Sequence, residues 1–195
     1  QENKNSSHIT DLSIKKESKN SKSHFFSNTL SKLKLSFFES SELEVNIETT
    51  SNDSYLKSHK INSEITNNNS LLNSFLTFRG NNEDLYLEAK VEAYEDLTKE
   101  QSSDKYQYLL PGFEISKNFN NNLNLVSNGY HKNYDTNIFE KVLINDLRYT
   151  SAPKIYSNGF VNKFNFLFKN ITSDSDNSEE FTNNFRSQNF GSILY

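Results

Sequence analysis

The sequence contains no cysteine, methionine or tryptophan, and only 5 of its 195 residues are glycine and 2 are proline. Without cysteine there is no disulfide framework and no thiolate metal site, and cysteine usage says nothing about redox compartment. The scarcity of glycine and proline argues against a flexible linker or a collagen-like repeat. No run approaches the roughly 18 consecutive apolar residues that a membrane-spanning helix requires, which excludes that class.

The start of the sequence also lacks common signals. It opens with the polar residues Gln1, Glu2 and Asn3, with neither an initiator methionine nor a charged-then-apolar leader. We therefore expect all 195 residues to be a fragment of a single domain, taken from the interior of a longer protein.

The composition combines high polarity with many aromatic residues. Only 33% of residues are hydrophobic and the mean hydropathy is −0.79, yet 13% are aromatic. A disordered segment carries fewer aromatic side chains than this. The 21 basic and 25 acidic residues give a net charge of −4, which argues against a nucleic-acid partner. A sheet with one apolar and one wet face would have this composition.

Strict alternation of apolar and polar residues recurs along the chain. In residues 42–48 the apolar residues are Leu43, Val45 and Ile47, separated by polar ones. In residues 85–94 the odd positions are Leu85, Leu87, Ala89, Val91 and Ala93, and the even positions are Tyr86, Glu88, Lys90, Glu92 and Tyr94. Successive side chains of a strand point to opposite faces, so these segments are predicted to be strands with one apolar side.

Other segments repeat the pattern less regularly. One predicted face carries Leu109, Pro111, Phe113 and Ile115, and another carries Phe160, Phe164, Phe166 and Phe168. Residues 138–149 have the composition of a strand but mixed parity. Pro111 has no N–H to donate, so it is predicted at a strand start, a bulge or a weakened pairing.

The connections between these segments differ in length. Short polar breaks are predicted at residues 39–41, 80–83, 118–122 and 151–154. Longer ones are predicted at 62–70, 97–105 and 172–180, with a briefer one near 132–136. Residues 50–61 are either a strand end with a loop or a separate short strand. Alternating short and long connections are typical of outer-membrane barrels. The fold expected is all-β, an antiparallel meander forming part of a transmembrane β-barrel. Soluble sandwiches, solenoids and adhesins, or an Asn/Ser-rich disordered tract, are the alternatives.

Several segments resemble the outer-membrane LPS-assembly protein family, LptD. Residues 45–57 are similar to its strand followed by Ser-Asp-x-x-Tyr-Leu-Arg, although Asn52 and Lys57 depart from that pattern. Residues 72–74, 93–97, 104–111, 123–134 and 141–147 are similar to later strands and loops of its barrel. The family-motif residues are Asp53, Tyr55, Leu56, Tyr106 and Pro111. The resemblance covers about residues 25–168 and lacks the first and last barrel strands.

The resemblance implies a non-enzymatic part of a translocon in the outer membrane of a Gram-negative cell. Lipopolysaccharide would pass with its sugar head in the barrel lumen and its acyl chains in membrane lipid. The implied protein partners are a lipoprotein plug, LptE, and a periplasmic bridge, LptA. The alternative function is a soluble or cell-surface β-sheet binding protein, such as an adhesin segment.

The functional residues expected under this interpretation line the lumen. They are the even positions Tyr86, Glu88, Lys90, Glu92 and Tyr94, which either bind the hydrated head group or only hydrate the pore. Asp53 and Tyr55 are either a hydrogen-bonding pair or a turn. The four histidines lack metal-ligand spacing and no nucleophile or phosphate-loop motif is present, so no catalytic residue, metal or cofactor is expected.

Overall fold

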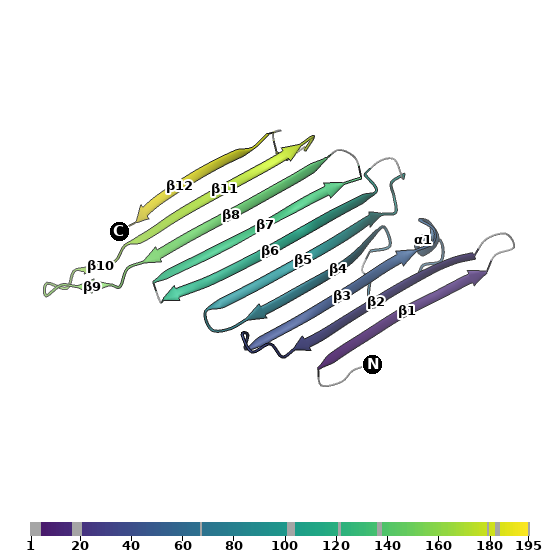
Figure 1. Ribbon diagram of the computed structural model, residues 1–195, viewed down its shortest axis with the longest axis horizontal. Helices are drawn as coiled ribbons and strands as arrows, with labels where there is room; N and C mark the ends of the chain where they lie inside the picture. The colour runs from purple at the N-terminus through teal and green to yellow at the C-terminus, as the bar shows by residue number, and fades with distance from the viewer. Residues whose placement is uncertain are drawn as a thin grey trace.

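The computed structural model is an all-β antiparallel meander (Figure 1). It describes residues 5–16, 21–66, 68–100, 104–120, 122–135, 138–178, 180–181 and 184–194. Ten strands form one sheet: β1 (Ser6–Lys16), β2 (Ser21–Leu33), β3 (Ser40–Thr50), β4 (Leu71–Asn81), β5 (Leu85–Asp96), β6 (Tyr106–Asn120), β7 (Leu123–Tyr134), β8 (Phe139–Thr150), β11 (Asn165–Asp176) and β12 (Arg186–Leu194). The predicted all-β meander is therefore confirmed.

The strands follow one another across the sheet in chain order, with β1 and β12 at its two edges. The small hairpin of β9 (Lys154–Ile155) and β10 (Val161–Asn162) is inserted between β8 and β11. The short helix α1 (Tyr55–Ser58) follows β3. The described part of the chain contains no helix long and apolar enough to cross a membrane.

Tight turns join β4 to β5 and β6 to β7 at one end of the sheet, which we call the turn end. The side-chain oxygen of Asn82 accepts hydrogen bonds from the amides of Asp84 and Leu85, at 3.1 and 2.9 Å, after β4. Asn120 does the same after β6, with the amides of Asn122 and Leu123 both at 2.8 Å. Such Asx turns reverse the chain within a few residues. The short connections predicted at 80–83 and 118–122 are confirmed.

Two predicted features of the C-terminal strands are wrong. The break at 151–154 is the start of a longer excursion through β9 and β10, so Phe160 and Phe164 lie outside β11 and only Phe166 and Phe168 share a face of it. The connection predicted at 172–180 begins only after Asp176, because residues 172–176 continue to pair with β8. Their Ser, Thr and Asp content resembles a loop, but pairing with neighbouring strands decides the outcome.

Pro111 lies in a β-bulge of β6. Between the paired positions Leu109 and Gly112 there are two residues of β6 but only one each of β5 and β7. The extra residue shifts the alternation, so Leu109 lies on the opposite face from Phe113 and Ile115. The prediction that Pro111 occupies a bulge is confirmed, whereas the prediction that Leu109 and Phe113 share a face is wrong.

Longer connections, including residues 51–70 and 97–105, lie at the other end of the sheet, which we call the loop end. The main buried apolar cluster lies here, around α1, and contains Phe26, Tyr55, Leu56, Leu72 and Leu97. Ile61 and Ile65 pack against it. Residues 50–61 are thus a strand end followed by a loop, one of the two predicted alternatives. This cluster fixes the loop of residues 51–70 against the sheet.

Candidate functional site

The pairing register assigns every strand residue to one of two faces, because directly opposed residues of neighbouring strands point the same way. One row across all ten strands reads Ser6, Ser31, Leu43, Phe78, Ala89, Phe113, Gly129, Leu143, Thr172 and Ser187. The adjacent row reads Ser7, Leu30, Glu44, Thr77, Lys90, Gly112, Tyr130, Val142, Ser173 and Arg186. We call the first the apolar face and the second the charged face.

All five residues predicted to line a lumen lie on the charged face. Tyr86, Glu88, Lys90, Glu92 and Tyr94 pair with residues of β4 and β6 on that face. The Tyr86 hydroxyl donates to Glu88 at 3.1 Å, and Lys90 Nζ lies 3.4 Å from Glu92. The structure therefore brings these side chains together on one surface of the sheet.

Arg79 is the centre of the charged face, and the sequence pattern did not reveal it. Its guanidinium donates to Glu42 at 3.3 Å, Glu44 at 3.1 Å and Glu88 at 3.0 Å. The three carboxylates come from β3 and β5, the two neighbours of the strand that carries Arg79. An arginine with three carboxylates leaves the surface around it acidic.

Four of the five family-motif residues, Asp53, Tyr55, Leu56 and Tyr106, lie at the loop end, whereas Pro111 lies in the bulge of β6. Lys105 Nζ lies 2.8 Å from Asp53 and 3.1 Å from Glu95, and the Tyr106 hydroxyl donates to Glu95 at 3.1 Å. Burial alone would lower the pKa of Lys105, but its hydrogen bonds to both carboxylates raise it above its ordinary value of 10.5. These contacts connect residues 51–70 to β5 and β6.

Tyr55 and Leu56 are 2% and 0% exposed, so they belong to the buried cluster. Asp53 and Tyr55 bond to different partners, and the Tyr55 amide donates to the carbonyl of Asn52 at 3.0 Å. This geometry is a turn leading into α1. Of the two predicted alternatives, the turn is the one observed.

A second polar cluster joins α1 to the first two strands. The Ser13 hydroxyl lies 2.7 Å from the Tyr55 hydroxyl and 3.4 Å from His24 Nδ1, while His24 Nε2 lies 3.1 Å from Asp11. Ser, His and Asp in contact suggest acid–base chemistry, but His24 is only 3% exposed and stacks on Phe26 at 4.6 Å. The cluster is therefore a structural link. Among the described residues no three metal-ligating side chains come together.

The apolar residues of the apolar face form a band that crosses the strands obliquely. In the row that contains Ala89, the central strands carry apolar residues but β1 and β12 carry Ser6 and Ser187. On β1 the apolar residue Leu12 lies six positions closer to the loop end than Ser6, and on β12 Ile193 lies six positions closer to the turn end than Ser187. The band thus shifts by twelve residues across ten strands.

The inclination of this band follows from strand dimensions. Twelve residues at about 3.4 Å each span about 40 Å, and nine steps between strands at about 4.8 Å span about 43 Å. Averaged over the ten strands, the band therefore crosses the strands at about 45°. The shift itself falls between β2 and β7, because Leu12 pairs with Phe25 and because Leu123, Tyr149, Phe166 and Ile193 lie in one row. Leu33, at the turn end of β2, lies away from it.

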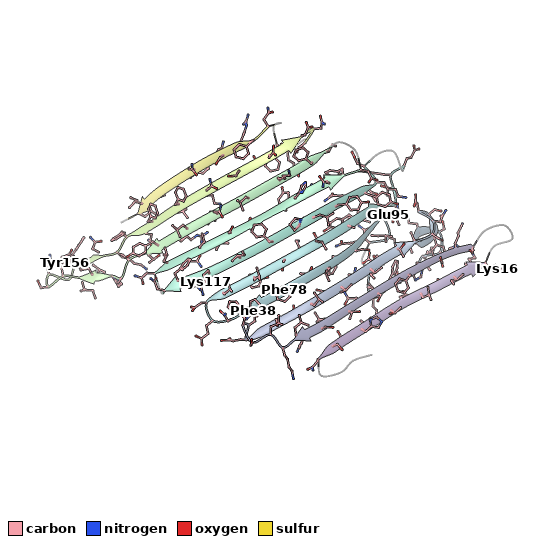
Figure 2. The ribbon with its side chains drawn as sticks, in the orientation of Figure 1. Lys16, Phe38, Phe78, Glu95, Lys117 and Tyr156 are labelled. Carbon is pink, nitrogen blue, oxygen red and sulfur yellow. The ribbon has the colours of Figure 1, made fainter. Side chains whose placement is uncertain are left out.

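Charged residues on the apolar face lie on either side of the band. Lys16, Glu95 and Lys117 are close to strand ends (Figure 2). Lys141 and Asp174 lie toward the loop end of β8 and β11, whereas the band crosses those strands toward the turn end, at Leu147 and Phe168. Phe38 packs edge-on to Phe78 at 5.8 Å in the space left by the missing side chain of Gly80.

Comparison of the chain with protein-family models, with curated proteins and with solved structures found no match. The resemblance to the LPS-assembly family consequently depends on the sequence segments alone.

Proposed function

We propose that this chain forms part of the wall of an outer-membrane β-barrel, with the apolar face in lipid and the charged face in the water-filled lumen. The observation that carries the proposal is the oblique apolar band. Strands of transmembrane barrels tilt by about 35–45° from the membrane normal, so a flat hydrocarbon layer meets successive strands at successively shifted positions. An inclination of about 45° is the value that this geometry requires.

The proposed cargo follows from the resemblance to the LPS-assembly family. Lipopolysaccharide would pass its head group along the charged face, with an LptE-like plug and an LptA-like bridge as partners. Glu88, Lys90 and Glu92 would contact a hydrated head group through exchangeable hydrogen bonds. Gram-negative outer membrane is the corresponding location, and the wall itself would perform no catalysis.

A second candidate is a soluble or cell-surface binding sheet, and one feature of the apolar face favours it. A polar row crosses β7, β8, β11 and β12 through Ser127, Asn145, Asn170 and Asn189. Their side chains are linked by hydrogen bonds of 2.7, 3.3 and 2.8 Å. Water would solvate this row readily. In lipid, the mutual hydrogen bonds would reduce the cost of the buried amides.

Site-directed spin labelling distinguishes the two candidates. This chain has no cysteine, so single cysteines at positions 86–91 can each carry a nitroxide in outer-membrane vesicles once any cysteine elsewhere in the full-length protein is replaced by serine. We expect collisions with oxygen, which concentrates in lipid, at Leu87, Ala89 and Val91. Collisions with a water-soluble nickel chelate should dominate at Tyr86, Glu88 and Lys90. Equal nickel accessibility at odd and even positions would refute the membrane wall.

The cargo needs a separate measurement. A photo-crosslinking amino acid at Glu88 should capture lipopolysaccharide in cells, whereas the same group at Leu87 on the apolar face serves as the matched control for capture from membrane lipid. If the alternating accessibility is observed but no lipopolysaccharide adduct forms at Glu88, the membrane wall stands and lipopolysaccharide is rejected as the cargo.

A further inference from the structure

A polar pocket of about 370 Å³ lies on the charged face beneath the loop of residues 51–70. Sites for small organic ligands occupy about 300–1,000 Å³, so the pocket is large enough for one. Its sheet side is formed by residues of β2–β5, and the polar ones are Asn28, Glu44, Asn46, Glu48, Asn73 and Tyr94. On the loop side the pocket is lined by Ile65, Thr66 and Asn68, and the apolar residues Leu71 and Phe75 of β4 complete the lining.

The sheet side of the pocket is held rigidly by its own hydrogen bonds. Asn46 and Glu48 are 5% and 9% exposed. The Asn46 amide group donates to Glu48 at 3.0 Å and to the carbonyl of Asn73 at 2.7 Å. The other Glu48 oxygen accepts from the backbone N–H of Asn73 at 3.0 Å. These bonds fill the gap that opens where the pairing of β3 with β4 ends, after Asn46 and Phe75.

One polar atom of the pocket lining is left over. The side-chain oxygen of Asn73 is buried and accepts no hydrogen bond from any described residue. A buried polar atom of this kind costs free energy unless a ligand or water donates to it. The Asn73 oxygen is thus an acceptor without a protein partner among the described residues, but neighbouring atoms cover it, so other groups form the open surface of the pocket.

The charges around the pocket select against an anion. Its carboxylates already have partners: Glu48 accepts from Asn46 and Asn73, and Glu44 accepts from Arg79 at 3.1 Å. Arg79 is in turn occupied by two further glutamates. No cation lines the pocket within the described residues. The amide nitrogens of Asn28 and Asn46 are also in use, toward Glu44, Asn46, Glu48 and Asn73. What remains to meet a ligand is the side-chain oxygen of Asn28, the amide of Asn68, the Tyr94 hydroxyl and the rings of Phe75 and Tyr94, beside the apolar Ile65 and Leu71.

We propose that this pocket binds a neutral saccharide unit and discriminates against phosphorylated sugars. Amide groups that both donate and accept match the hydroxyls of a sugar, and the rings of Phe75 and Tyr94 can cover its apolar C–H surface. A phosphate at the same place would face Glu44 and Glu48 without a free cation. The proposal rests on the proposed function in one respect: the charged face must be open to water.

The test uses the purified full-length protein in detergent and an array of neutral glycans, with phosphorylated versions of the same glycans alongside. We expect neutral glycans to bind and their phosphorylated versions to bind at least tenfold more weakly. Asn28→Ala and Tyr94→Phe should each weaken neutral-glycan binding at least fivefold. Asn128→Ala and Tyr130→Phe are the matched controls on the same face outside the pocket, and both should bind as the unmodified protein does.

Three results would overturn the proposal: no neutral glycan binds, the phosphorylated versions bind equally well, or the pocket variants bind like their controls. The urea midpoint of each variant, measured alongside, shows whether it has folded. If no glycan binds but spin-label accessibility still alternates along positions 86–91, only the saccharide site is rejected. Loss of that alternation rejects the membrane wall, whatever the glycans do.

Discussion

Replacing Arg79 by methionine tests whether the charged face is organised by this one side chain. Methionine keeps most of the aliphatic stem but removes the guanidinium that contacts Glu42, Glu44 and Glu88 at 3.0–3.3 Å. A hydrogen bond to a charged group contributes about 1.5–3 kcal/mol when shielded, and an exposed ion pair about 0–1 kcal/mol. Because the Arg79 side chain is 35% exposed, we take about 1 kcal/mol for each contact.

The expected loss for Arg79→Met is therefore roughly 2–3 kcal/mol in the free energy of unfolding. With a urea dependence of about 2 kcal/mol per molar, the midpoint of the full-length protein should fall by about 1–1.5 M. Arg148→Met is the matched control: its side chain is 64% exposed and lies 3.8 Å from Asp146. That change should cost less than about 0.5 kcal/mol.

A double-mutant cycle separates ion pairing from lost packing. Glu88→Gln alone should destabilise the protein by about 1 kcal/mol, because it weakens one Arg79 contact. Added to Arg79→Met, the same change should be neutral or stabilising, because it removes one of three carboxylates left without a cation. Additive destabilisation in the double variant, or equal effects of Arg79→Met and Arg148→Met, would contradict the reasoning.

Three further predictions concern the core, the loop end and the apolar face. Leu56→Ala should cost about 2–5 kcal/mol, since Leu56 is 0% exposed, with faster hydrogen exchange across residues 51–66 as the local readout. Lys105→Met should lower stability by about 1–2 kcal/mol at pH 8. Because the folded pKa of Lys105 is raised, this difference should persist below pH 10.5 and vanish as the pH rises through the raised value. Ala89→Arg should impair barrel assembly by about 2–4 kcal/mol, seen as lost heat-modifiable gel mobility, whereas Lys90→Ala should assemble normally.

The sequence predicted well those strands in which the apolar band covers most of one face. In β5 every odd position from Leu85 to Ala93 is apolar and every even position is polar, so periodicity alone assigned both faces. In β1 the band covers only Leu12 and Ile14, and Ile9 lies on the other face. Because the oblique band covers only one or two positions of each edge strand, apolar and polar residues hardly alternate there. β1 and β12 could therefore not be predicted from periodicity.

Local defects account for the errors within predicted strands. The bulge at Pro111 inverts the faces of β6 within one residue, and a sequence pattern shows the proline but not the direction of the slip. In β8, Lys141 and Asn145 lie on the apolar face, which explains the mixed parity of that segment. A mixed pattern can therefore mark a strand whose apolar face carries a polar row.

The candidate site was predictable where it follows a single strand and hidden where it joins several. Alternation in β5 was enough to place Glu88 and Lys90 on one surface. Arg79 meets Glu42 and Glu44 only through the pairing of β3 with β4, across 37 and 35 positions of sequence. Contacts between residues on different strands depend on the pairing register. The register depends on turn lengths and bulges across the whole sheet, so the sequence of one strand does not show it.

The oblique band also constrains what covers the apolar face. Leu76 and Leu143 are 43% and 36% exposed, so among the described residues no second layer covers these central positions. A second sheet would pack at about 30° or 90° to the strands and would form a patch bounded by its own edges. A lipid layer is flat and continuous, so every strand must meet it at the same height and therefore at a constantly shifting residue. The total shift from Leu12 on β1 to Ile193 on β12 has the size that a lipid layer requires, although it falls between β2 and β7: Leu12 is level with Phe25, and Ile193 shares a row with Phe166, Tyr149 and Leu123.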